Sequence, residues 1–169
     1  MMTAARAFTA ALDIRAAELA DAWVIGDLMR RCEVFGPAER DCVDEMFRET
    51  WAAPRPDNYR WLIGWRDGQP AGFACYGLES LTRDTWDLFW ICVAPEARGQ
   101  GVGQALLAWA ERRARQEDGR LMVIYTASTP AYAPARRLYE RCGFVRVATV
   151  PDYYADGDHL HIYWKRLCG

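Results

Sequence analysis

Residues 93–115 read VAPEARGQGVGQALLAWAERRAR, and this stretch decides the fold. Gly99, Gly101 and Gly103 lie in five consecutive positions, and a helical pattern begins directly after them. Glycines cost backbone entropy, so we expect three of them to serve a need for bare backbone. The first N–H groups of a helix lack intrahelical partners and carry partial positive charge, which attracts phosphate. The stretch therefore predicts an anion site between a buried strand and a helix.

Three phosphate-binding designs compete for this glycine turn. The loop of nucleotide hydrolases ends in Gly-Lys-Ser/Thr, whereas Gly103 is followed by Gln104 and Ala105. The dinucleotide fingerprint GxGxxG needs a further glycine at position 104 or 106, which hold Gln104 and Leu106. The third design, Arg/Gln-x-x-Gly-x-Gly/Ala, is present from Arg98 to Gly103. The alternative is a tight turn that merely needs positive φ, for which we expect one glycine to suffice.

Apolar periodicity divides the chain into strands and helices. We expect strands at 12–15, 59–66, 72–78, 85–93, 121–125, 144–150 and 160–164, and helices at 19–32, 39–51, 102–118 and 135–142. Asp67-Gly68 predicts a hairpin turn, and Pro151–Asp158 reads as a polar, aromatic loop. The order β-α-α-β-β-β-α-β-α-β-β contains two strand–helix–strand crossovers, so part of the sheet should be parallel.

The chain is thus expected to be one α/β domain over residues 1–169. It should hold a single mixed, partly parallel sheet of about seven strands flanked by about four helices. Four aromatic residues near the predicted helices could line a pocket, but their helical spacing favours the core: Trp23, Phe35, Phe47 and Trp51.

Composition excludes several classes of protein. The 169 residues are 51% hydrophobic, enough for a well-buried core. A formal net charge of −2 gives no support for nucleic-acid binding, which usually shows a basic stripe. We expect neither a signal peptide nor a membrane span, because charged residues such as Asp13 and Arg15 interrupt the first apolar residues.

Cysteine and histidine spacing points to neither disulfides nor a metal. The six cysteines contain no CxxC pair and most lie in periodic apolar patterns, so we expect buried free thiols in a reducing cytoplasm. His159 and His161 share one face of a predicted strand, without further ligands nearby. An exposed strand face is the interpretation that we favour over a metal site.

Two segments together resemble one family. ICVAPEARGQGVGQALL (91–107) resembles the acetyl-CoA-binding motif of the GNAT superfamily of N-acetyltransferases. ARRLYERCGF (135–144) resembles the next motif of that superfamily, a helix carrying a tyrosine followed by Gly-Phe and a strand. Both motifs in this order and at this separation make a strong signal, whereas residues 1–80 carry almost none of it.

The resemblance implies where acetyl-CoA would bind. Strands 86–93 and 121–126 would diverge at their C-terminal ends, with the pantetheine arm between them. Backbone groups of Ile91–Val93 would pair with that arm, and the pyrophosphate would rest on amides of Gln100–Gly103, with Arg98 adding charge. The residues expected to bind the cofactor are Ile91, Cys92, Val93, Arg98, Gly99, Gln100, Gly101, Val102, Gly103 and Tyr139.

Acyl transfer to an amine needs a base, a polarised carbonyl and a proton for the departing thiolate, but no covalent enzyme intermediate. Tyr139 matches the tyrosine that can protonate the thiolate, a role compatible with a core position. A backbone amide near Ile91–Val93 would polarise the carbonyl. Asp87, the single charge in TWDLFWICV, is the leading base and Glu79 a weaker one. An ion pair with an arginine is an equally favoured interpretation of Asp87.

The acceptor site should be built from the first two expected helices, the 79–85 loop and Pro151–Asp158, within PDYYADGDH (151–159). Here Tyr153 and Tyr154 lie among acidic residues, and such a rim suits a cationic amine. The alternative is a solubilising turn. Glu79, Tyr153 and Tyr154 are the expected substrate-binding residues. One departure is Tyr132, which stands seven residues before Tyr139 where many family members carry asparagine.

These observations favour an acetyl-CoA-dependent N-acetyltransferase acting on a primary amine of a small molecule or peptide. Dimers are common in the superfamily, so a homodimer is an open expectation. The alternative is a non-catalytic acyl-CoA-binding sensor or partner domain. A third interpretation, a redox or hydrolytic nucleotide enzyme, would bind NAD or ATP in preference to coenzyme A.

Overall fold

The computed structural model describes residues 11–55 and 59–167. Seven strands form one sheet in the order β1-β2-β3-β4-β5-β7-β6. The strands are β1 (Leu12–Ala16), β2 (Arg60–Arg66), β3 (Gln69–Leu78), β4 (Thr85–Val93), β5 (Leu121–Ala127), β6 (Val145–Ala155) and β7 (Asp158–Arg166). The helices are α1 (Ala22–Arg31), α2 (Pro37–Ala52), α3 (Val102–Gln116) and α4 (Ala133–Arg141), with short 3-10 turns η1 (Leu19–Asp21), η2 (Pro95–Ala97) and η3 (Pro130–Tyr132). The expected α/β order of strands and helices is confirmed.

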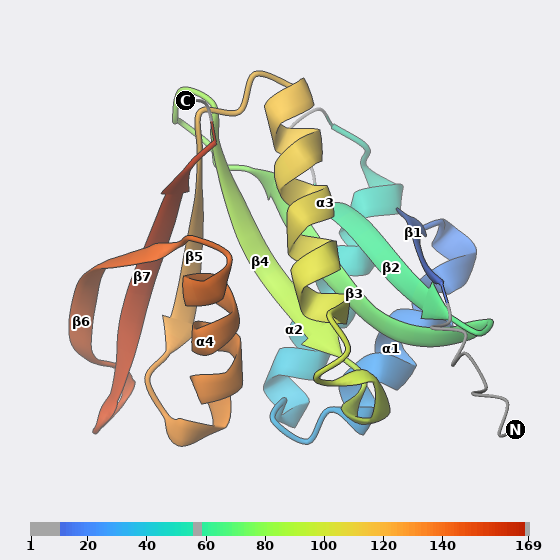
Figure 1. Ribbon diagram of the computed structural model, residues 1–169, viewed down its shortest axis with the longest axis horizontal. Helices are drawn as coiled ribbons and strands as arrows, with labels where there is room; N and C mark the ends of the chain where they lie inside the picture. The colour runs from blue at the N-terminus through green and yellow to red at the C-terminus, as the bar shows by residue number, and fades with distance from the viewer. Residues whose placement is uncertain (1–10, 56–58, 168–169) are drawn as a thin grey trace, which may run out of the picture.

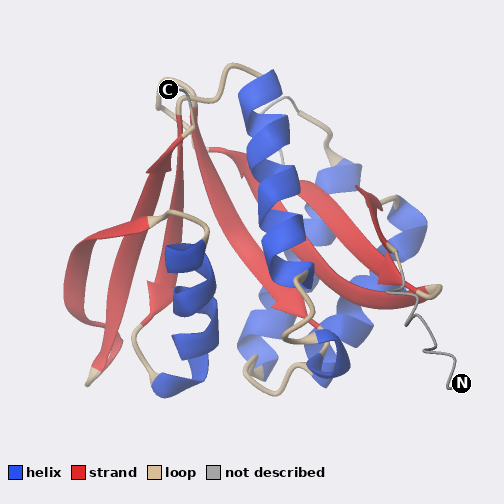
Figure 2. Cartoon of the chain, viewed as in Figure 1, coloured by secondary structure: helices blue, strands red, loops and turns tan. Residues whose placement is uncertain are grey.

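The helices cover both faces of the sheet. Figure 1 shows α3 and α4 on the face toward the viewer and α1 and α2 behind it. The secondary-structure view in Figure 2 shows the same layers, with the sheet between the helices. The apolar residues of β3 and β4 are therefore buried on both sides, as expected for central strands.

The pairing of β4 with β5 is short. The two strands are parallel and joined at Thr85–Leu121, Trp86–Met122 and Asp87–Val123, after which no further pair is formed. Both strands continue beyond that point and diverge (Figure 1). All other pairings in the described sheet are antiparallel. The crossover through α4 adds no parallel pair, because β7 lies between β5 and β6. The mixed sheet and the divergence of these strands match the expectation.

Each of the three glycines around the start of α3 has a local structural reason. Gly99 and Gly101 have φ angles of 72° and 79°, which favour glycine, and a Cβ on either would meet nothing within 4 Å. Gly103 has ordinary backbone, but a Cβ there would lie 2.9 Å from Leu138 Cδ2. The turn alone therefore uses two glycines rather than one, and the third lets α3 approach α4.

Trp23, which was expected in the core, lies on the exposed face of α1. Trp23 is 62% exposed and Leu19 is also exposed, whereas the buried positions are Val24, Ile25, Leu28 and Met29. Phe35 and Phe47 lie in the core as expected, but Trp51 sits at its edge. The prediction for Trp23 was wrong because helical periodicity allows more than one set of apolar residues in this segment to face the core.

The segment Pro151–Asp158 is strand for most of its length, not a loop. β6 runs through to Ala155, and its register against β7 shifts after Val150, with Asp152 at a φ angle of 51°. A proline is tolerated because β6 is an edge strand with one side unpaired in the described sheet. The turn is confined to Asp156 and Gly157.

Several smaller expectations can be checked. His161 is buried and shares a hydrogen bond with Thr149 Oγ1, so its strand face is not exposed. The five described cysteines are free, but Cys42 is exposed and Cys142 half-buried; Cys168 lies outside the described residues. Among helices of residues 11–55 and 59–167, none has the length and apolar character to cross a membrane.

Candidate active site

A cleft of about 1740 Å³ opens where β4 and β5 diverge. One wall comes from the end of α1 and the start of α2. The floor comes from β4 beyond Asp87, and the other wall from the end of β5 and from α4. The glycine turn and the first residues of α3 complete the cleft. Beyond Asp87, this edge of β4 has no strand beside it in the described sheet, so an extended ligand has backbone groups available there.

Most of the residues expected to bind the cofactor line this cleft. They are Ile91, Cys92, Val93, Arg98, Gly99, Gly101, Val102, Gly103 and Tyr139. Gln100 is the exception, because its side chain braces the turn. Its Nε2 donates to the carbonyl of Glu96 at 2.7 Å, and its Oε1 accepts a hydrogen bond from Arg66.

The charge and backbone of the cleft suit a long phosphorylated ligand. No side chain of the described residues caps the N-terminus of α3, and its first intrahelical bond joins Ala105 N–H to the Gly101 carbonyl at 3.0 Å. The amides before Ala105 lie beside open space at Gly99 and Gly101. Arg31, Arg98 and Arg141 line the cleft and add positive charge. These features fit coenzyme A, whose phosphates need donors and whose arm needs an extended groove.

Asp87 lies at the point where the β4–β5 ladder ends. It is 4% exposed, and its Oδ1 has no hydrogen-bond partner among the described residues. Burial raises the pKa of Asp87 to about 7, and the negative charge of Glu79 adds to this effect. The alternative of an ion pair with an arginine is not seen, since no such pair involving Asp87 is formed within the described chain. A buried carboxyl group whose pKa lies near neutral pH is typical of a general base.

Tyr139 faces the cleft from α4 while its ring lies in the core. It is 5% exposed, and its ring packs edge-on against that of Tyr163, with 5.7 Å between the ring centroids. Burial, followed by the nearby Tyr163 and Asp87, raises the pKa of Tyr139 well above its usual value. Its hydroxyl therefore keeps its proton throughout the neutral range. Asp87 and Tyr139 both line the cleft, so the two expected catalytic groups lie in one site.

The expected acceptor residues are dispersed. Glu79 lies in a second pocket of about 230 Å³, which shares Tyr59 and Phe89 with the main cleft. Tyr154 lines the main cleft, whereas Tyr153 is exposed outside it and packs edge-on against Tyr154 at 4.9 Å.

Two features of the cleft were not expected from the sequence. Tyr132 Oη donates to Glu39 Oε1 at 2.5 Å, and both residues line the cleft. Glu39 also caps α2, because the Gly36 N–H donates to its Oε2 at 2.7 Å. The Gly-Pro-x-Glu pattern could have indicated this cap, but not the contact with Tyr132. Cys32, interpreted as a core thiol, also lines the cleft.

Comparison with known proteins places this geometry in a family. The family model described as "Acetyltransferase (GNAT) family" matches residues 24–144. An aminoalkylphosphonate N-acetyltransferase of Salmonella typhimurium is 32% identical over 104 residues, which are 59% of this chain and 66% of that protein. The chain thus spans slightly less than two thirds of that relative's length.

Solved structures extend the likeness to nearly the whole chain. A GNAT-family protein of Desulfovibrio desulfuricans has a TM-score of 0.88 and 34% identity, covering 94% of this chain and 100% of that one. A Salmonella typhimurium structure with its cofactor acetyl-CoA has a TM-score of 0.72 at 22% identity, covering 94% of this chain and 95% of that one, and shows the same fold. With the matched family model over residues 24–144, these findings show that the chain belongs to the GNAT acetyltransferase family.

Proposed function

We propose that this protein transfers an acetyl group from acetyl-CoA to a primary amine of a small molecule or peptide, by direct attack and without a covalent enzyme intermediate. One observation carries the proposal. A buried carboxylate, Asp87, lies at the apex of the opening between β4 and β5 without a partner for its Oδ1 among the described residues, in a site shared with Tyr139.

When bound, acetyl-CoA supplies an activated acetyl thioester. The chain's own groups then divide the remaining work. Asp87 accepts a proton from the acceptor ammonium, directly or through water, because its pKa of about 7 leaves much of it charged at neutral pH. Backbone N–H groups near Ile91–Val93 donate to the acyl oxygen as negative charge develops there. The nitrogen–carbon bond forms and the carbon–sulfur bond breaks.

Tyr139 holds the proton that the departing sulfur needs. With its pKa raised, the phenol is a weaker acid than a thiol, so it acts first as a hydrogen-bond donor at Oη. Donation to a developing thiolate is charge-assisted and therefore stronger than a neutral hydrogen bond. The products are the acetylated amine and free coenzyme A.

The acceptor enters from the acidic side of the site. Glu79 lies in the smaller pocket next to the cleft and is close enough to Asp87 to raise its pKa. Tyr59 and Phe89 border both spaces and offer aromatic faces to a cation. A cationic amine would thus be held near Glu79 before it loses its proton to Asp87.

The test is to mix the protein with acetyl-CoA and a panel of primary amines, while recording the release of free thiol and the mass of the acetylated product. We expect thiol release that depends on the amine. Tight binding of acetyl-CoA with no thiol from any amine would instead favour the non-catalytic sensor. Stabilisation by NAD or ATP rather than coenzyme A would contradict both.

A further inference from the structure

A pair of thiols lies in the wall of the cleft. Cys32 follows the last residue of α1 and is 1% exposed, whereas Cys92 is in β4 and is 3% exposed. Although 60 residues separate them in the chain, their Sγ atoms are 2.9 Å apart. This separation is shorter than a van der Waals contact between two sulfur atoms, and a disulfide at about 2.05 Å needs only a small further approach.

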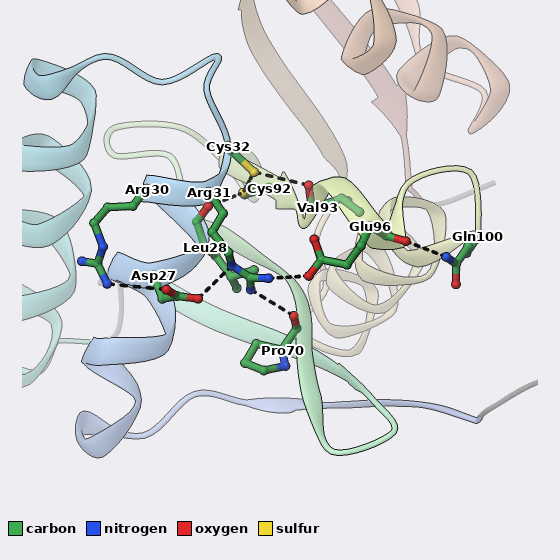
Figure 3. Close-up of polar contacts among 10 residues, drawn as sticks. All are labelled: Asp27, Leu28, Arg30, Arg31, Cys32, Pro70, Cys92, Val93, Glu96 and Gln100. Atoms are coloured by element: carbon green, nitrogen blue, oxygen red, sulfur yellow. Dashed lines mark hydrogen bonds and ion pairs between the residues drawn. The ribbon is translucent and has the colours of Figure 1, made fainter.

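Figure 3 shows how the surrounding groups hold the pair in place. Cys32 Sγ donates to the Val93 carbonyl at 3.3 Å, and Cys92 Sγ donates to the Leu28 carbonyl at 3.7 Å. The end of α1 and the end of β4 are therefore tied together through both sulfur atoms. Cys92 lies within the regular strand β4, and Cys32 is the C-cap of α1, where its own N–H donates to the Leu28 carbonyl at 3.1 Å.

Fixed positive charge lies next to the pair. Arg31 forms ion pairs with Asp27, at 2.8 Å between Nε and Oδ2, and with Glu96, and its Nη2 donates to the Pro70 carbonyl at 3.3 Å (Figure 3). The hydrogen-bonding contact with Cys92, and then Arg98 and the charge of Arg31, lower the pKa of the Cys32 thiol, although burial opposes them. The thiolate is the reactive form of cysteine, so Cys32 is the nucleophile of the pair.

We propose that Cys32 and Cys92 are a site of reversible oxidation, at which a hydroperoxide converts the two thiols into one disulfide. The Cys32 thiolate attacks the terminal peroxide oxygen, the O–O bond breaks, and a sulfenic acid forms on Cys32 as alcohol or water leaves. The Cys92 sulfur then attacks the Cys32 sulfur, the S–O bond breaks, and water leaves. Two thiols lose two electrons and the hydroperoxide gains them; a dithiol reverses the step.

This site is coupled to the cofactor cleft, a statement that rests on the proposed function. Cys92 lies between Ile91 and Val93, and both sulfur-bearing residues line the cleft beside Arg98. Acetyl-CoA in the cleft would cover the route by which an oxidant reaches Cys32. Disulfide formation would also remove the hydrogen bond from Cys32 to the Val93 carbonyl, a group next to the proposed path of the pantetheine arm.

The experiment treats the reduced protein with hydrogen peroxide and digests it with trypsin under non-reducing conditions. Trypsin places Cys32 in peptide 32–40, Cys92 in peptide 84–98 and Cys42 in peptide 41–48. We expect a cross-linked species of peptides 32–40 and 84–98 with a loss of two hydrogens, restored by a dithiol. Cys32→Ser and Cys92→Ser should abolish it separately, and Cys42→Ser, at an exposed position, should leave it unchanged.

The proposal is overturned if peroxide leaves peptides 32–40 and 84–98 unlinked while Cys42 is oxidised, or if the cysteines link in other pairs. A second arm repeats the reaction with acetyl-CoA, which carries no free thiol. At a concentration far above its Kd we expect cross-linking to slow by about tenfold or more. A disulfide that forms at the same rate with and without acetyl-CoA would support the oxidation of Cys32 and Cys92 but contradict binding of acetyl-CoA in this cleft. The failure of one proposal can therefore be distinguished from the failure of the other.

Discussion

Tyr132 Oη donates to Glu39 Oε1 at 2.5 Å, joining two cleft-lining residues that lie 93 positions apart in the chain. One belongs to η3, the turn that precedes α4, and the other to the first turn of α2. The bond therefore links segments on opposite sides of the opening between β4 and β5. Tyr132 is also the position, seven residues before Tyr139, at which the family resemblance led us to expect asparagine.

The first prediction concerns this link. Tyr132→Phe removes the hydroxyl but keeps the ring, so we expect a loss of about 1 kcal/mol in the free energy of unfolding, measured with urea. Because the link spans the cleft, the KM for acetyl-CoA should change more than kcat. Tyr153→Phe, outside the cleft, is the control and should change neither. Equal behaviour of the two variants would mean that the link has no role.

The second prediction separates the function of Asp87 from its effect on stability. Asp87→Asn removes the base, so kcat should fall by about 100-fold or more. The folded state raises the pKa of this carboxyl to about 7, so keeping it charged above that pH costs stability. At pH 8 the variant should unfold at a higher temperature, by about 2–4 °C for each kcal/mol of cost removed. This gain should shrink as the pH falls toward 4; a loss of stability at pH 8 would contradict it.

The third prediction is a pH profile. Since the charged form of Asp87 is the base, kcat/KM should rise with pH through a value near 7. Glu79→Gln removes a negative charge that raises the pKa of Asp87, so the rise should move to lower pH. A profile unmoved by Glu79→Gln would show that another group sets it.

The fourth prediction concerns the proton donor. Tyr139→Phe keeps the ring contacts with Tyr163 and Phe144 and removes only the hydroxyl. We expect kcat to fall by about tenfold or more, with the Kd of acetyl-CoA near that of the unchanged protein. Calorimetric titration gives the Kd and thiol release gives kcat. Unchanged turnover would remove Tyr139 from the donor role.

The fifth prediction tests the glycine turn with a matched control. Gly101→Trp fills the open space beside the amides before α3, so binding of acetyl-CoA should be lost. It also forces a bulky residue to a φ angle of 79°, which costs about 1–2 kcal/mol by itself. Gly68→Trp imposes the same strain at a φ angle of 72° in the β2–β3 turn, with equally open space. It should lose similar stability and keep binding; parallel loss of binding would place the phosphates elsewhere.

Local pattern was sufficient for most of the fold. Strand and helix periods differ, so the order of elements could be read directly, and the hairpin turn at Asp67-Gly68 has positive φ at both residues as its type requires. The edge strand β6 was harder, since Pro151 and neighbouring aspartates disfavour strand unless one side is unpaired. The prediction that Trp23 lies in the core was wrong for a different reason. Helical periodicity alone did not decide which side of α1 faces the core.

The site depended on contacts that no local pattern carries. The glycine turn, Asp87 and Tyr139 lie in or next to recognisable motifs, and the structure brings them to one cleft. The bond between Tyr132 and Glu39 and the contact between Cys32 and Cys92 join distant segments, so they follow only from the packing of the helices. Gln100 sits inside the motif, yet its side chain is drawn away by Arg66 on β2.

The sheet is continuous between β4 and β5 through only three residue pairs, which join the part formed by β1–β4 to the part formed by β5–β7. A ligand in the cleft that forms hydrogen bonds with both parts would add to this connection. Binding of such a ligand would then reduce the motion of the whole sheet and not only of the cleft. Amide hydrogen exchange should then slow on the distal strand β6 as well as beside the ligand.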